Sequence, residues 1–165
     1  MIVLEELEYL AQKKEAKNYK FRTYLKNHAD PDELDRQFKK LHEKYFSIYD
    51  CSKCRNCCTK YCGTIPTEDI PKDAELLGMT TEEFIGKYLR EVPNSGGYNT
   101  KNCPCDFFVD NACILGDSRP NACKEFPHTD KEDRMGSLLS IIENTSVCPV
   151  VYEIMEELKK MYGFH

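Results

Sequence analysis

The sequence predicts a mainly α protein with a short β-hairpin. In this prediction a small, loop-rich domain is organised around a cysteine-ligated metal centre, and an N-terminal helical hairpin precedes it. Three observations lead to it: 165 residues suffice for one domain with a real core, apolar residues recur at helical spacing near both ends, and ten cysteines are present. We therefore divide the chain into N-terminal helices, residues 1–48, and a cysteine-cluster metal-binding domain, residues 49–165.

The charge and the cysteine content narrow the class of protein. A net charge of -5 and a pI near 5.5 argue against a general affinity for nucleic acid or an anionic membrane. The opening "MIVLEELEYLAQKK" lacks the basic and apolar regions of a secretory signal, and no apolar run approaches the ~20 residues that span a membrane. We expect a cytoplasmic location, where thiols stay reduced and clustered cysteines bind metal or do redox chemistry.

Two helices are expected before the cysteines. Residues 3–28 have apolar positions at both ends and a polar middle, which leaves room for a break near Asn18. The second helix is capped by Asp30, with Glu33 at capping-box spacing, and we expect its His42 to be a surface residue. The basic residues of the first helix form either a solvated surface or a docking face for an acidic protein partner.

The remaining elements are shorter. We expect a helix over 67–77 that ends at Gly78, another that begins at Thr80, a loop over 93–102, and an exposed polar segment over 129–137. Residues 105–115 read as two strands around Asp110 and Asn111, and residues 119–126 as one or two helical turns. The final helix covers 149–162, with these residues expected to face inward: Val151, Ile154, Leu158 and Met161.

The run "CSKCRNCCTKYC", residues 51–62, has the spacing of a metal site. Two residues between cysteines let both sulfurs reach one ion, and each added thiol would repel its neighbours without a metal. The adjacent Cys57 and Cys58 have diverging side chains, so they bridge two metals or serve two sites. That geometry predicts ligands elsewhere, among them Cys148 at the N-cap of the last helix, where the helix dipole favours a thiolate.

Four segments in order carry a family resemblance: "CSKCRNCC", "EDIPKDAELLGM", "PCDFFVDNACILGDSRPNACKEFPH" and "ENTSVCP". Together they resemble the YkgJ-like CxxCxxCC family, described as zinc- or iron-chelating cysteine-cluster proteins, over roughly residues 48–160. The resemblance leaves Cys62 and Cys103 outside the pattern and places the Arg-Pro of the family on Arg119-Pro120. It implies eight metal ligands: Cys51, Cys54, Cys57, Cys58, Cys105, Cys113, Cys123 and Cys148.

Thiolate-only ligation suits zinc or an iron–sulfur cluster, and eight cysteines suffice for more than one metal ion. The spacing leaves both metals open, with a slight preference for iron–sulfur. Arg119 is the candidate cofactor-binding residue, as a counter-charge to the thiolates, and its alternative is a surface arginine at a helix start. His128 is either a ligand or, as we expect, a residue that orients its loop.

Three functions remain open from the sequence. The first is a metal-binding protein whose iron–sulfur or zinc centre has a structural or redox role. The second is an iron–sulfur oxidoreductase or methyl-transfer enzyme, since flagellin lysine N-methylases carry a related cluster. The third is a metal-handling or adaptor protein that acts through its N-terminal helices. The sequence shows no serine nucleophile setting and no phosphate-binding loop, so any catalysis would fall to the metal centre, and no catalytic residue is assigned.

Overall fold

The computed structural model describes residues 2–165, and its mainly α class with a short β-hairpin confirms the prediction. Chain packing separates two compact units. The helical unit contains the residues up to Cys54 together with Pro127–His165, and the cysteine-rich unit contains Arg55–Phe126. A boundary after residue 48 stays a prediction. The two units are described one at a time.

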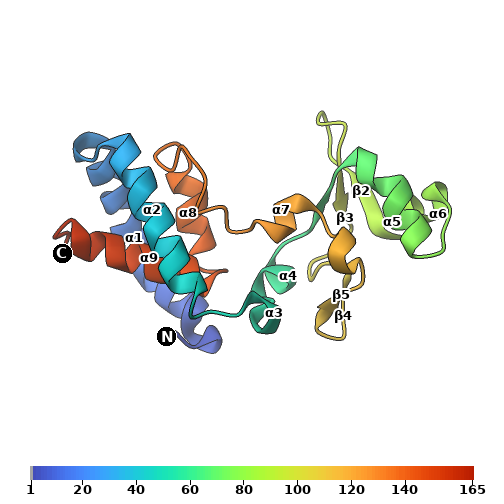
Figure 1. Ribbon diagram of the computed structural model, residues 1–165, viewed down its shortest axis with the longest axis horizontal. Coiled ribbons are helices and arrows are strands. Elements are labelled where there is room, and N and C mark those ends of the chain that lie inside the picture. The colour runs from blue at the N-terminus through green and yellow to red at the C-terminus, as the bar shows by residue number, and fades with distance from the viewer. Residues whose placement is uncertain (1) are drawn as a thin grey trace. The chain divides into compact units, whose positions relative to one another are not determined.

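Long helices form the helical unit, and α9 is its centre (Figure 1). Its helices are α1 (Leu4–His28), α2 (Pro31–Phe46), α3 (Cys51–Cys54), α8 (Leu138–Asn144) and α9 (Pro149–Met161). Helix α9 packs against α1, α2 and α8, and most of its residues are buried. Such a helix is hydrophobic on several sides because it lies inside its unit. The inward-facing residues predicted for it are confirmed except Met161, which is 50% exposed at its last turn.

Helix α1 is continuous through the polar middle where the sequence allowed a break. Its buried residues follow one stripe at helical spacing, and Asn18 lies on that stripe with 1% of its surface exposed. The helix packs on both α8 and α9. Packing against two other helices, rather than the helix propensity of its own residues, therefore keeps α1 helical past Asn18.

The polar segment 129–137, expected to be exposed, contains two buried residues. The Arg134 guanidinium donates hydrogen bonds to the carbonyls of His128 (2.6 Å) and Glu132 (2.7 Å). The Asp35 carboxylate on α2 accepts from the backbone N–H groups of Asp133 and Arg134, at 2.8 Å each. The expectation was wrong because these polar groups are satisfied by partners inside the unit instead of by water.

His42, expected at the surface, is half-buried. Its Nδ1 lies 2.9 Å from the hydroxyl of Thr129, which is fully buried. Burial lowers the pKa of His42, and the charge of Asp130 opposes this effect. The ring therefore joins α2 to the 129–137 segment as a hydrogen-bonded part of the helical unit.

The cysteine-rich unit combines short strands with short helices. Its three-stranded antiparallel sheet has the order β1 (Thr64–Ile65), β3 (Tyr98–Thr100), β2 (Leu89–Glu91), and β4 (Phe108–Val109) pairs with β5 (Ala112–Cys113). Its helices are α4 (Asn56–Lys60), η1 (Thr67–Asp69), α5 (Ile70–Leu76), α6 (Thr81–Tyr88), η2 (Gly116–Ser118) and α7 (Asn121–Lys124). Its core consists of Ile65, Ile70, Ala74, Phe84, Leu89, Phe107 and Leu115.

The central strand β3 lies where a loop was expected over 93–102. It pairs Thr64 with Asn99 on one side and Arg90 with Asn99 on the other. Its Gly- and Asn-rich surroundings carry no strand signal. Strand β2 pairs with it locally across residues 92–97, whereas β1 comes from more than thirty residues earlier. The prediction failed there because the Gly and Asn content marked the turn and hid the short strand that follows it, which the distant β1 also pairs with.

Local signals were confirmed by their hydrogen bonds. The Asp30 carboxylate accepts from Glu33 N (2.9 Å), and Thr80 and Glu83 form a complete capping box at the start of α6. Asp110 and Asn111 both have positive φ, 49° and 60°, as the two-residue turn of a right-twisted hairpin requires.

A pH-dependent stability follows from His42. Since burial lowers its pKa in the folded state, the unfolded chain takes up the proton first as the pH falls below about 6.5. The free energy of unfolding of the wild type should therefore drop more than that of His42→Asn between about pH 7.5 and about pH 5.5. Denaturant titrations measure this difference, and His28→Asn, at an exposed histidine, is the matched control. Identical slopes for wild type and His42→Asn would contradict the assignment.

Candidate metal centre

The cysteine run begins on two very short helices. Cys51 and Cys54 lie on α3, whose start is held by the Asp50 carboxylate through the backbone N–H of Ser52 (2.9 Å). Arg55 then adopts a left-handed conformation with φ 48° and precedes α4, which carries Cys57 and Cys58. The boundary between the two units falls between Cys54 and Arg55. The run is therefore shared, with two cysteines in each unit before Cys62.

In the helical unit, Cys148 lies in the electric field of Cys51 and Cys54. It is the N-cap residue of α9, as predicted, and it is 7% exposed. Its pKa is raised to about 12, first by burial and then by the charges of Cys51 and Cys54, against the opposing effect of the N–H groups of Val151 and Val150. The helix start favours the thiolate, but burial of the sulfur outweighs it.

In the cysteine-rich unit, thiols from separate elements are close enough to repel one another. The pKa of Cys123 is raised to about 11, first by burial and then by the charges of Cys105, Cys58 and Cys113. The pKa of Cys58 is raised by its hydrogen bond with Cys57 and then by burial. Ionising any one of these sulfurs without a nearby cation is therefore unfavourable.

Backbone and core contacts bring these elements together. Cys105 N donates to the carbonyl of Cys58 (2.9 Å), which joins α4 to the segment before β4. Cys113 lies on β5 opposite Phe108. Two aromatic rings, those of Tyr61 after α4 and Phe126 after α7, meet edge to face at 5.8 Å. The cysteine positions thus depend on contacts between segments far apart in the sequence.

The sulfur of Cys105 has a set of hydrogen-bond donors that the sequence did not reveal. Burial raises its pKa, and the backbone N–H groups of Phe107 and Gly63 and the hydroxyl of Thr100 lower it. A Cβ on Gly63 would lie 3.6 Å from Cys105 Sγ and 3.5 Å from Thr100 Cγ2. Gly63 directly after Cys62 is the one sequence signal of such a close approach, and nothing in the sequence marked Thr100. N–H···S contacts of this kind support a negatively charged metal site.

The charge of Arg119 changes the pKa of two cysteines in this unit. Its positive charge lowers the pKa of both Cys58 and Cys123. It directly follows η2, where the Ser118 hydroxyl donates to Asp73 Oδ1 at 2.7 Å. Asp73 is fully buried on α5 and its pKa is raised by burial. Asp73, which the sequence did not single out, therefore anchors the turn that presents Arg119.

The eight predicted ligands thus form two groups, three in the helical unit and five in the cysteine-rich unit. Within residues 2–165, no three Cys, His, Asp or Glu side chains are already arranged to hold one ion. The ligand roles of the eight cysteines and of Arg119 stay predictions. His128 has a left-handed φ of 60°, and its carbonyl accepts from Arg134, so its backbone shapes the loop.

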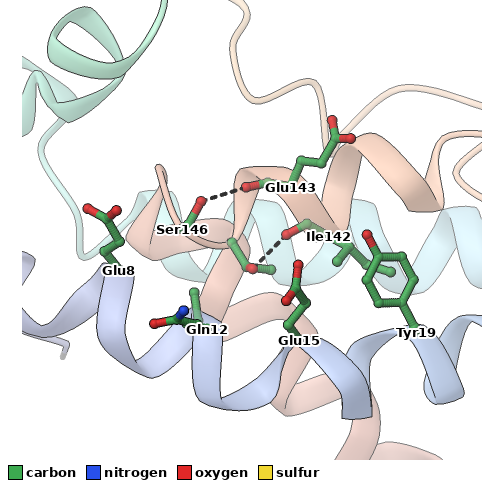
Figure 2. A pocket seen from close by; sticks show the side chains of 9 residues that line it. Glu8, Gln12, Glu15, Tyr19, Ile142, Glu143 and Ser146 are labelled. Carbon is green, nitrogen blue, oxygen red and sulfur yellow. Dashed lines mark hydrogen bonds between the residues drawn. The ribbon is translucent and has the colours of Figure 1, made fainter.

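A groove in the helical unit is distinct from these cysteines (Figure 2). It has a volume of about 290 Å³, lies between α1 and α8, and contains the acidic residues Glu8, Glu15 and Glu143. Two of its hydroxyls donate to the backbone, that of Ser146 to the carbonyl of Glu143 and that of Thr145 to the carbonyl of Ile142. With no sulfur in its lining, the groove is not part of a thiolate centre.

Clustered thiols on a mainly α scaffold define a cysteine-cluster protein. Residues 50–149 match the family described as "CxxCxxCC: Putative zinc- or iron-chelating domain". The match covers more than half of the chain, so the chain belongs to the CxxCxxCC family. No curated protein and no solved structure matches it. Along residues 2–165, no helix combines the length and the apolar character needed to cross a membrane.

The two kinds of cysteine should differ in metal content. Cys58→Ser and Cys123→Ser should each lose about one bound ion per chain, because each removes a sulfur from the crowded group. Cys62→Ser, the matched control only four residues from Cys58, should keep its metal. Metal analysis of variants with wild-type circular dichroism measures the difference. Equal losses from Cys58→Ser and Cys62→Ser would contradict this division of the cysteines.

Proposed function

We propose that the protein holds a thiolate-ligated iron–sulfur or zinc centre through its eight family cysteines, and that the role of the metal is chiefly structural. One observation carries the proposal: the cysteine-bearing helices α3, α4 and α7 have only four or five residues each and bury none of them. Helices this short are not stable in water by themselves. A metal that joins their sulfurs would supply the missing stabilisation.

The small apolar core and the large free energy of metal binding support a structural role for the metal. The apolar core of the cysteine-rich unit has only seven buried residues, none of them on α4 or α7. Small domains with limited cores usually need disulfides, metals or partners. Binding of a structural zinc ion contributes roughly 10–16 kcal/mol, which exceeds the whole stability of many small domains. Metal binding would therefore decide whether the cysteine-bearing segments are ordered.

The donor set suits soft metals. Sulfur ligands favour zinc or iron–sulfur clusters over magnesium or calcium. The donors around Cys105 and the positive charge of Arg119 favour sulfur in its ionised form, which is the form that binds metal. Bound zinc would supply cross-links between segments, and a bound iron–sulfur cluster would add the capacity to accept an electron.

Anaerobic purification with analysis of iron, zinc and acid-labile sulfide tests the proposal. We expect stoichiometric metal, with iron and sulfide together if the cluster is the native form. Stoichiometric zinc without sulfide would assign a zinc centre. A well-folded protein with neither metal would overturn the proposal.

Hydrogen exchange before and after chelation tests the structural role. Metal removal should abolish amide protection in α4, α7 and the β4–β5 hairpin, because few buried contacts hold them. Protection in α2 and α9 should persist, since their buried residues pack together. Those two helices are the internal control. Unchanged protection of α4 and α7 in fully metal-free protein would rule out a structural role.

Arg119 provides an independent test of the centre. Arg119→Gln removes the positive charge next to Cys58 and Cys123 and should weaken metal binding about 10–100-fold. Arg119→Lys keeps the charge and should lose less. Competition with a chromogenic chelator measures the affinity, and Arg90→Gln is the control because Arg90 contacts Cys62 instead. Equal affinities for the wild type and Arg119→Gln would assign Arg119 to the surface.

A further inference from the structure

Two cysteines of the cysteine-rich unit, Cys62 and Cys103, are left outside the eight family ligands. Cys62 lies between α4 and β1, and Cys103 lies in the exposed turn after β3. Both are thiols in the structure, Cys62 half-buried and Cys103 exposed. They are far apart in the chain, so their placement depends on the tertiary structure.

Hydrogen bonds on both sides hold the two segments together. On one side, Gly63 donates to the Thr100 hydroxyl (2.9 Å) and its carbonyl accepts from Thr100 N (2.8 Å). On the other side, the Cys58 carbonyl accepts from Cys105 N (2.9 Å). These bonds continue the antiparallel register of β1 and β3. Cys62 and Cys103 lie within the stretch that the two pairs enclose.

The side chains of Cys62 and Cys103 also approach each other. Cys103 Sγ donates to the carbonyl of Thr59 at 3.6 Å, which directs it toward the end of α4. Burial raises the pKa of Cys103, and the charge and the hydrogen bond of the neighbouring Cys62 raise it further. The Arg90 guanidinium on β2 donates to Cys62 Sγ at 3.9 Å. Two adjacent thiols, one of them exposed to solvent, can be joined by oxidation.

We propose that Cys62 and Cys103 form a reversible disulfide when the protein meets a hydroperoxide. One of the two sulfurs, as its thiolate, attacks hydrogen peroxide and becomes a sulfenic acid, and the other oxygen of the peroxide leaves as water. The neighbouring sulfur then displaces the hydroxyl of the sulfenic acid as a second water. Two thiols are oxidised to one disulfide, and one hydroperoxide (hydrogen peroxide in the test below) is reduced to two waters.

The local structure permits the bond. A disulfide requires an S–S distance of about 2.05 Å, so the two neighbouring sulfurs must approach further. Residues 101–104 are exposed and outside the apolar core, so this turn has room to shift. The bond would tie the end of α4 to the turn after β3, and with them the segments that carry Cys58 and Cys105. The modification is separate from the proposed metal centre in its residues and in its chemistry.

Peptide mapping of the full-length, anaerobically purified holoprotein tests the proposal. The protein is treated with hydrogen peroxide, its remaining thiols are alkylated, and it is digested with trypsin without reduction. We expect the peptide 61–72 linked to the peptide 102–124, with fragment ions that place the bond at Cys103 and alkylation at Cys105. Dithiothreitol should release the link, and both Cys62→Ser and Cys103→Ser should abolish it. A denatured sample oxidised in the same way is the control and should give mixed pairs.

Three outcomes would overturn the proposal: no link in native protein, a link that joins Cys62 to Cys105, or Cys103 oxidised beyond the sulfenic acid without a link. The double variant Cys62→Ser/Cys103→Ser should retain wild-type metal content. Its loss of metal would place the pair in the ligand set and would also overturn the proposal. A 62–103 link in protein that never binds metal would support this inference while the proposed metal centre failed, so the two are distinguished.

Discussion

Burial of the cysteine sulfurs away from water, together with repulsion among them, is the constraint around which the cysteine-rich unit is built. Cys58, Cys105 and Cys123 come from three separate segments, yet each is close enough to disfavour ionisation of another. Partial burial strengthens the effect because water no longer screens the charges. The unit offsets it with the positive charge of Arg119 and with donors to the sulfur of Cys105. Under the proposed function, a soft cation would complete the compensation and stabilise the short elements around the sulfurs.

In the helical unit, too, burial disfavours the ionised form of a cysteine while nearby donors favour it. Cys148 starts α9, whose buried side chains fix its position between α1 and α2, and the field of the helix start acts against burial of the sulfur. A deep core therefore holds one thiol rigidly, whereas Cys51 and Cys54 lie on the short and exposed α3. These three sulfurs therefore lie on one rigid segment and one compliant segment. This combination would let the compliant segment rearrange when metal binds.

Sequence reasoning succeeded where the decisive contacts are local. The caps at Asp30 and Thr80 depend on residues three positions away, and the hairpin turn depends on two adjacent residues that tolerate positive φ. It failed where a polar residue has a distant partner. His42 binds Thr129, and Asp35 binds the backbone of Arg134. Thr129 and Arg134, which look like surface residues in the sequence, are therefore buried, and His42 is half-buried. Strand β3 was missed partly for the same reason, since its partner β1 comes from a distant part of the chain, although its other partner β2 is local.

The sequence by itself determined the donor chemistry and the family, because sulfur ligands and their spacing are properties of the chain alone. It also marked Cys62 and Cys103 as extra cysteines. Only the tertiary structure decided which sulfurs are neighbours: that Cys54 and Cys57 belong to different units, that Gly63 and Thr100 contact Cys105, and that the two extra cysteines form a pair. The physical reason is that these neighbours are set by strand pairing and helix packing, which join residues that have no local signal for each other.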